Sequence, residues 1–404
     1  RFLAEARNMA SMSHPNIIKV TDLIDDGDTV AFVMEYIEGK TLKEYLDRKG
    51  KLSDEEIKTI FSQMLEAVGY VHEQNLVHRD IKPSNFMINP KGKIMAALGL
   101  PSIIQGGMGI AVSSWQLAQQ VAIAGELGVI SGTAIDSVVA RRLQDGDISG
   151  DIRRAMSHFP NQQTISEIMD RFFIEGGRAA DKPYLDVPKL SIKGNLFSNN
   201  LLAVSSFVEV WLAKEGHNGL IGMNILEKIQ LAIPAQLYGA MLAEVDYILI
   251  GAGIPAQIPH ALNEISLGNK VAMKVEVADT KDKHYLHFDP RTLGIENFPV
   301  KRPQFLAIVS SHALVAYLNK DEETKPDGFV IEYHVAGGHN APPRAKNAID
   351  ENGEAVYNDL DIPNLEKILA SGSPFWLAGG FATPAKVVEA LAHGAKGVQV
   401  GSVF

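Results

Sequence analysis

Residues 375–402 read FWLAGGFATPAKVVEALAHGAKGVQVGS and contain an apolar run, a glycine pair, a helical stretch and a second apolar run. The two apolar runs, residues 375–378 and 398–401, are short and rich in aromatic or β-branched side chains, which is typical of buried strands. Between them, residues 384–392 begin on a proline and end shortly before a glycine, as helices often do. The order predicts two parallel strands joined by a crossover helix.

The same alternation extends back along the chain. Six further short apolar runs predict strands at residues 102–105, 128–131, 220–224, 247–251, 305–310 and 328–332. Helices are expected between strands at residues 115–125, 235–243 and 363–370. Eight buried strands alternating with helices predict an α/β fold, a (β/α)8 TIM barrel. Two long insertions, residues 133–199 and 275–303, interrupt the pattern, and residues 271–277 are expected to add a hairpin strand.

The character of the sequence changes at Met95. Residues 1–94 hold 5 of the 35 glycines and residues 95–404 hold the other 30, with no flexible linker between the two parts. We therefore predict two domains, residues 1–94 and residues 95–404. Because Arg1 lies inside a helical pattern and Phe404 directly follows the last expected strand, we expect the first domain to be partial and the barrel to be truncated at its C-terminus.

Composition limits the class of protein. The chain has 404 residues, is 46% hydrophobic, carries a formal net charge of -10 and contains no cysteine. The lack of cysteine excludes disulfides, thiolate metal sites and cysteine nucleophiles, and favours a cytoplasmic location. The negative charge argues against a nucleic-acid partner, and no apolar run reaches the ~18 residues of a membrane helix. Nothing in the sequence identifies a protein partner.

The first domain predicts a small α+β structure. Residues 29–36 predict a strand, and residues 42–49 and 52–74 predict helices. Ser53 and Glu56, three positions apart, form a capping box at the start of the longer helix. Apolar residues at helical spacing then form a stripe along it, made of Ile57, Ile60, Phe61, Met64, Leu65, Val68 and Val71.

The segment after that helix contains HRDIKPSN at residues 78–85 and resembles the catalytic loop of Ser/Thr protein kinases. Upstream, SHPNIIKV and MEYIEG are similar to the kinase segments after the αC helix and at the hinge, and Glu5 lies in an αC-like helix. The resemblance implies that Asp80 is the base for the substrate hydroxyl, that Lys82 contacts the phosphate transferred from ATP, and that Asn85 binds Mg²⁺.

Several kinase parts are missing from this sequence. No glycine-rich loop or strand lysine precedes Glu5, and no DFG follows Ile88. Since kinase catalysis depends mostly on positioning and electrostatics, we expect a kinase fragment without phosphotransfer activity. Two alternatives stay open. One is a working Ser/Thr kinase in residues 1–94, and the other is a chimera, a non-functional fusion of two gene fragments in which Met95 was an original start codon.

The second domain carries glycines directly after several expected strands. In a barrel the C-terminal strand ends converge on one mouth, and the last two often build a phosphate site from backbone amides. LAGGF and VQVGS occupy these positions and offer Gly379, Gly380, Gly401 and Ser402. The alternative is that the glycines only permit tight turns. The sixth strand leads into His339, a candidate base at the same mouth, with His334 as its competitor.

Six motifs in order, IIQGGMG, GVISGTA, GMN, AGGHNAPPR, LAGGF and GVQVGS, resemble the nitronate monooxygenase family over residues 98–404. The resemblance implies an FMN-dependent monooxygenase that oxidises nitroalkane or nitronate substrates with O₂. His339 would be the base that removes the carbon-bound proton of the substrate. The implied FMN contacts are Gly379, Gly380, Gly401 and Ser402 for the phosphate, Gln105, Gly106 and Met108 for the ring, and Asn224 and Gln399 as further contacts.

Two positions depart from that family. Tyr333 follows Glu332 where the family usually has glycine, which places a bulky ring where little room is expected. The fifth expected strand, FLAIVSS, has no lysine where some members carry one, and Lys274 is the candidate replacement.

Overall fold

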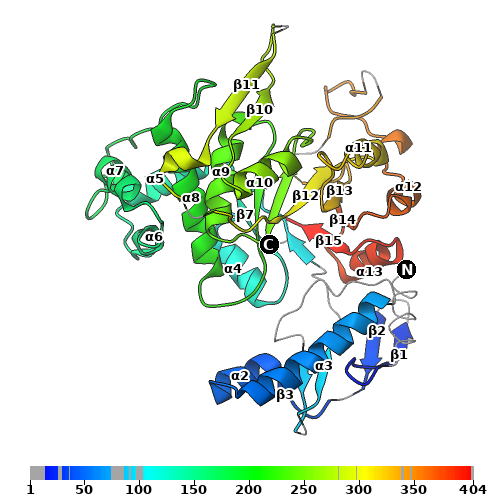
Figure 1. The fold of residues 1–404 in the computed structure, drawn as a ribbon. Helices are drawn as coiled ribbons and strands as arrows, with labels where there is room; N and C mark the ends of the chain where they lie inside the picture. The colour runs from blue at the N-terminus through cyan, green and yellow to red at the C-terminus, as the bar shows by residue number, and fades with distance from the viewer. Residues whose placement is uncertain are drawn as a thin grey trace. The chain divides into compact units, whose positions relative to one another are not determined.

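The computed structural model describes residues 14–25, 30–35, 37–73, 86–90, 92–96, 103–280, 282–296, 298–337, 341–345 and 348–401. The chain divides into two compact units (Figure 1). One comprises residues 1–102 with residues 382–396, and the other comprises residues 103–381 with residues 397–404.

The first unit combines short antiparallel strands with helices. Its described elements are β1 (Val20–Asp25), β2 (Val30–Met34), β3 (Lys40–Thr41), α2 (Leu42–Lys49), α3 (Asp54–Glu73), β4 (Phe86–Ile88), β5 (Ile94–Ala96) and, from the later part of the chain, α13 (Pro384–Ala392). β1 pairs with β2, and β3, β4 and β5 form a three-stranded antiparallel sheet. This sheet continues through Ala96, two residues beyond the boundary expected at residue 94.

The longer helix, α3, begins with the capping box that its sequence predicts. Glu56 accepts hydrogen bonds from the Ser53 backbone and hydroxyl and returns its own N–H to the hydroxyl, which confirms the capping box. The apolar stripe of α3 is only partly buried. Ile60 is 6% exposed and belongs to the core, whereas Phe61 is 58% exposed and Leu65 is 67% exposed.

The second unit is built on one eight-stranded parallel sheet. In chain order the strands are β6 (Ile103–Gln105), β7 (Gly128–Ser131), β8 (Ile221–Leu226), β9 (Tyr247–Gly251), β12 (Gln304–Val309), β13 (Gly328–Glu332), β14 (Phe375–Ala378) and β15 (Gly397–Val400). β15 pairs with β6, and a parallel bridge from Ile104 to Leu127 joins β6 to the start of β7. The strands therefore follow chain order around a closed, barrel-like sheet, as the sequence predicts.

Helices and one hairpin connect these strands. The helices are α4 (Trp115–Ile123), α5 (Ile135–Gln144), α6 (Asp151–Met156), α7 (Gln162–Phe172), α8 (Leu196–Lys214), α9 (Ile233–Leu242), α10 (Ile258–Ser266), α11 (His312–Leu318), α12 (Leu365–Ala370) and α13 (Pro384–Ala392). Single 3-10 turns occur at Gln230–Ala232, Pro290–Leu293 and Asp359–Asp361. α5, α6 and α7 lie within the first insertion. β10 (Val271–Val275) and β11 (His284–Phe288) form the expected hairpin, which projects away from the other elements of its unit (Figure 1).

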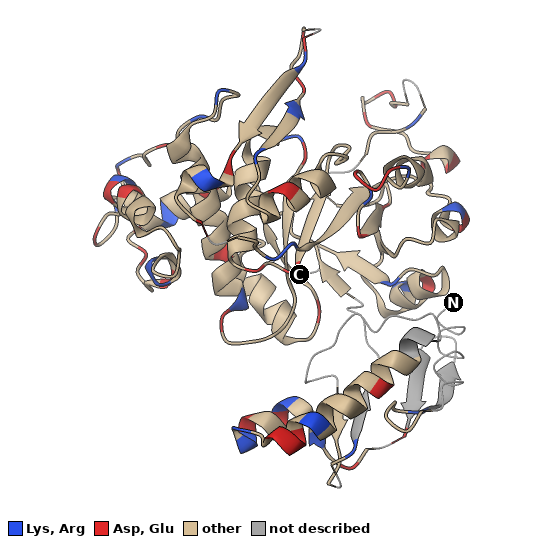
Figure 2. Ribbon diagram, in the orientation of Figure 1, with Lys and Arg blue, Asp and Glu red and all other residues tan. Residues whose placement is uncertain are grey.

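The interior of the sheet is apolar. Ile104, Val129, Leu249, Leu306 and Val330, from five different strands, are buried in one cluster. Figure 2 shows that charged residues in this unit lie mainly on helices and loops, while the strands are nearly free of them. Among the described residues, α8 alone is long and apolar enough to cross a membrane, but 78% of that stretch is buried inside the protein, as in a core helix.

Candidate active site

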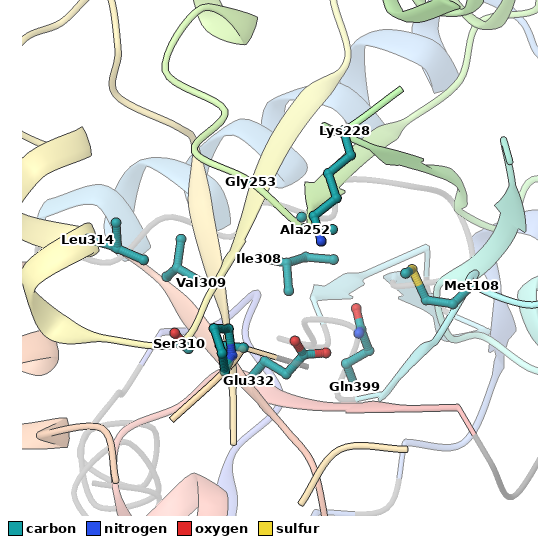
Figure 3. Close-up of a pocket in the computed structure, with 13 residues that line it drawn as sticks. Met108, Lys228, Ala252, Gly253, Ile308, Val309, Ser310, Leu314, Glu332 and Gln399 are labelled. Atoms are coloured by element: carbon teal, nitrogen blue, oxygen red, sulfur yellow. The ribbon is translucent and has the colours of Figure 1, made fainter. Parts of the chain in front are cut away.

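A cavity of about 380 Å³ lies at the C-terminal ends of the barrel strands (Figure 3). Its apolar lining includes Met108, Ile308, Val309, Leu314, Ala341 and Pro342. Its polar lining consists of the side chains of Lys228, Ser310, Glu332 and Gln399 and the backbone of Gly251, Ala252 and Gly253. The cavity therefore offers an apolar space with a few polar groups, which is typical of a small-molecule site.

Strand register explains why two of these polar groups meet. Glu332 on β13 is paired with Ala378 on β14, and Ala378 is paired with Gln399 on β15. Residues paired in this way point to the same side of a sheet, and Ala378 belongs to the interior cluster, so all three point inward. Because alanine is small, it leaves space between its two long neighbours. Figure 3 shows the Glu332 and Gln399 side chains extending into the same space.

Glu332 lies in an unusual environment for a carboxyl group. No described residue gives its carboxyl a hydrogen bond or an ion pair. Burial raises its pKa to about 7, because removing the charged form from water is unfavourable. The group is therefore substantially protonated near neutral pH and can donate as well as accept a hydrogen bond.

Two predicted FMN contacts are buried amides with unused polar atoms. The Asn224 side chain is 1% exposed, and neither its oxygen nor its nitrogen has a hydrogen-bond partner among the described residues. Gln399 is 8% exposed, and its Oε1 also lacks a described partner. Buried polar atoms are nearly always hydrogen-bonded in folded proteins, so these amides indicate positions where a bound group is able to complete the bonding.

Two other predicted ring contacts have a different environment from the one expected. The Gln105 amide is fully buried and already used, since Oε1 accepts from the Val129 N–H at 2.9 Å and Nε2 donates to the Gly106 carbonyl at 2.9 Å. Gly106 donates its own N–H to the Val400 carbonyl at 2.7 Å. These bonds join β6 to β7 and β15. Of the three predicted ring contacts, Met108 alone lines the cavity.

The predicted phosphate glycines follow β14 and β15. Gly379 and Gly380 have φ values of +88° and +85°, which favour glycine over other residues. A methyl group on Gly379 would lie 2.9 Å from the Tyr333 carbonyl oxygen, so close packing also requires glycine there. No described residue accepts a hydrogen bond from the N–H groups of Gly379, Gly380 or Gly401. These amides are therefore available to an anion, as the phosphate prediction requires.

Of the two histidine candidates, His334 is among the described residues. His334 stacks on Tyr357 with ring centroids 4.7 Å apart, and it lines a small neighbouring cavity instead of the main one. Ala341 and Pro342, which follow His339 closely in the sequence, line the main cavity. The Arg344 guanidinium fastens this segment by donating to the Ser310 carbonyl at 2.7 Å.

Tyr333, the departure noted in the sequence, is accommodated beside the glycine pair. Its ring packs edge-on against Phe381 with centroids 5.4 Å apart. Lys274 lies on β10 in the hairpin and is not among the residues that line the cavity.

Several predicted site residues lie outside the described residues: His339, Ser402, Asp80, Lys82 and Asn85. Conversely, Glu332 and Lys228 line the cavity but were not predicted from the sequence as site residues. A signal for Glu332 was present, because it is the last residue of a buried strand and shares the inward side with Val330. Lys228 follows β8 in a loop and carries no comparable signal.

Comparison with known proteins bears on the first unit. Residues 1–107 match the protein kinase domain family, which confirms the kinase resemblance of the N-terminal region. The chain is 36% identical over 131 residues to Serine/threonine-protein kinase PrkC of Bacillus subtilis (strain 168), covering 32% of this chain and 19% of that protein. It is 35% identical over 114 residues to Sperm motility kinase 2B of Mus musculus, covering 28% and 22% respectively.

The chain thus spans about a fifth of the length of the curated relatives it matches. Among solved structures, a crystal structure of Rad53 1-466 in complex with AMP-PNP is similar at 25% identity. That match covers 25% of this chain and 28% of the other chain, with a TM-score of 0.24.

Proposed function

We propose that the second unit is an FMN-dependent oxidoreductase of the nitronate monooxygenase type, which oxidises nitroalkane or nitronate substrates with O₂. The observation that carries this proposal is the set of unpaired amides at one end of the barrel. The N–H groups of Gly379, Gly380 and Gly401, from which no described residue accepts a hydrogen bond, suit a phosphate. The Asn224 amide and the Gln399 Oε1, which lack partners among the described residues, suit the polar edge of a flavin ring.

The residues present fit such a cofactor in shape as well as in bonding. No heavy atom of the described residues lies within 4 Å of a Cβ added to Gly401, so those residues leave the space in front of it open. Met108 and Ile308 supply apolar walls for a flat ring in the cavity. Gln105 was expected to contact the flavin ring, but its amide holds β6 against β7 instead. Its bond to the Gly106 carbonyl also keeps the Gly106 turn in place.

In this proposal the protein and the cofactor have separate tasks. FMN, when bound, supplies the electron transfer and the reaction with O₂. The cavity walls orient the substrate and exclude water, and Gln399 offers a hydrogen-bond acceptor at the barrel end of the cavity. His339 is the proposed base that removes the carbon-bound proton of a nitroalkane, and Arg344 holds the segment that follows it.

Changing Gly401 to alanine tests the phosphate site. The methyl group meets no atom of the described residues, so we expect an unchanged melting temperature. We expect roughly tenfold weaker FMN binding, because the methyl group occupies space at the phosphate amides. The measurement is an FMN titration followed by quenching of flavin fluorescence. Gly69→Ala is the control, since Gly69 also has open space but lies on α3. Failure of the unaltered chain to bind FMN would remove the proposal.

A second candidate function is Ser/Thr phosphotransfer by the first unit, and the comparisons favour it more directly than they favour the flavin chemistry. The supporting observation is the match of residues 1–107 to the protein kinase domain. Against it, the segment after Ile88 reads NPKGKIMAALGL and has no DFG carboxylate for a metal ion.

This second candidate predicts transfer of phosphate from ATP and Mg²⁺ to a Ser/Thr substrate. In it, Asp80→Ala lowers the rate by about a hundredfold or more, because the base for the substrate hydroxyl is lost. The measurement is incorporation of labelled phosphate into a generic basic protein substrate by the full chain. Transfer that persists unchanged in Asp80→Ala comes from a contaminant, and absence of transfer in the unaltered chain rules the candidate out.

A further inference from the structure

Glu332 is the one carboxyl group among the described residues that line the main cavity, and the sequence resemblance gives it no role. It faces Gln399, whose Oε1 has no partner in the part of the chain that the structure describes, and Lys228 lines the same cavity from the loop after β8 (Figure 3). Apart from the two residues proposed to flank the flavin ring, the apolar wall consists of Val309, Leu314, Ala341 and Pro342.

The other charged or titratable groups near Glu332 belong to the adjoining segments. His334 and Arg344 line the small neighbouring cavity, which shares Ser310, Ala341 and Pro342 with the main one. Arg344 is engaged by the carbonyls of Leu360 and Ser310. The Glu227 carboxyl lies against Gly253 at the edge of the cavity and interacts with Lys228, and burial raises its pKa as well. His339 lies outside the described residues. Glu227 and His339 are therefore the groups that a pH experiment has to separate from Glu332.

We propose that Glu332 is a specificity-determining residue, which in its neutral form admits the anionic head group of an aliphatic substrate and in its ionised form excludes it. The neutral acid donates its O–H to an oxygen of the anion, Lys228 supplies a positive charge, and the apolar wall takes the alkyl chain. The proposal rests on the proposed function in one respect, since a nitronate is an aliphatic anion of this kind.

The physical reason is that charges inside the cavity are screened less than charges in water. Two negative charges at close range repel each other more strongly in a protein interior than in water. Burial raises the pKa of Glu332 to about 7, so the neutral form is available under ordinary conditions. Anion binding is therefore complete below that pKa and is lost as the pH rises through it, whereas binding of a neutral molecule is unaffected.

The test uses hexanoate as an unreactive aliphatic anion and hexanamide as its neutral counterpart. Binding of each to the full chain, saturated with FMN if it binds FMN, is measured by calorimetry at about pH 6 and about pH 8. With a pKa near 7, hexanoate is expected to bind about tenfold more weakly at the higher pH, and hexanamide equally at both. In Glu332→Gln, which keeps the size and a hydrogen-bond donor, the tenfold ratio disappears.

Lys228→Met is the second variant, and because this lysine is exposed the change is compatible with folding. This variant is expected to bind hexanoate more weakly at both pH values and to preserve the ratio of the two affinities. Hexanoate binding that does not depend on pH in the unaltered chain overturns the proposal. A pH ratio that survives in Glu332→Gln also overturns it and points to Glu227 or His339 instead. FMN binding is measured separately by titration. If the chain does not bind FMN but its hexanoate affinity still depends on pH through Glu332, only the proposed function is ruled out.

Discussion

Replacing Gly239 with alanine is expected to destabilise the second unit by roughly 3 kcal/mol, at the upper end of the usual cost of overpacking a core. Gly239 lies on α9, where an added Cβ would be 2.0 Å from the carbonyl oxygen of Ala203 on α8 and 2.6 Å from its carbonyl carbon. Both neighbours are backbone atoms, so no side-chain rotation relieves the clash. The two helices have to separate.

Tryptophan fluorescence measures this effect without interference from the first unit. All three tryptophans, Trp115, Trp211 and Trp376, belong to the second unit. We expect the unfolding midpoint in urea to fall, and the melting temperature to drop by roughly 6–12 °C. Gly69→Ala is the matched control, because it is also a helical glycine but has open space around it.

The control is expected to change stability in the opposite direction, since alanine favours a helix over glycine by roughly 1 kcal/mol when no clash occurs. Because Gly69 lies outside the unit that contains the tryptophans, its effect is measured as the part of the unfolding transition seen by far-ultraviolet circular dichroism, which reports the helices of both units, and not by tryptophan fluorescence. An unaltered fluorescence midpoint in Gly239→Ala would mean that α8 and α9 are less closely packed than described.

The barrel could be predicted from the sequence because each strand carries its own local signal. Residues 375–378 and 384–392, read as a strand and a helix, are found as Phe375–Ala378 and Pro384–Ala392. Short apolar runs that end at glycine are informative because a buried parallel strand is apolar on both faces and its turn needs a small residue. Such signals need no knowledge of distant residues.

The use of a polar side chain is harder to predict, because it depends on partners far away in the chain. Gln105 was expected to face a flavin ring, yet its amide bonds across to Val129, a neighbour created only when β6 and β7 come together. For the same reason, burial along the apolar stripe of α3 could not be predicted from its spacing. Helical spacing correctly places Ile60 and Phe61 near one face, but burial of Ile60 and exposure of Phe61 depend on what packs there.

Glu332 lies between these two cases. Its inward direction follows from alternation along β13, which a sequence can reveal. Its raised pKa does not follow from alternation, because it depends on Ala378 being small, on Gln399 being the next residue across, and on the absence of a described cation bonded to the carboxyl. The inward direction of the Glu332 side chain was therefore predictable from the sequence, whereas its raised pKa was not.

His339→Ala is expected to lower nitroalkane oxidation by the full chain by about a hundredfold to ten-thousandfold, the usual range for loss of a general base. FMN binding should remain, because the proposed phosphate contacts come from glycine amides after β14 and β15 and not from this side chain. The rate is measured as O₂ consumption with a primary nitroalkane. His334→Ala is the matched control, since His334 lines the neighbouring cavity and stacks on Tyr357.

The choice of substrate separates a base from a merely structural histidine. A nitronate has already lost the carbon-bound proton, so an enzyme without its base should still oxidise it, whereas an enzyme with a distorted cavity should not. We therefore expect His339→Ala to recover most of its rate when the preformed nitronate replaces the nitroalkane. If both substrates are slowed equally, His339 is not the base, and if His334→Ala shows the substrate-dependent loss, the base is His334.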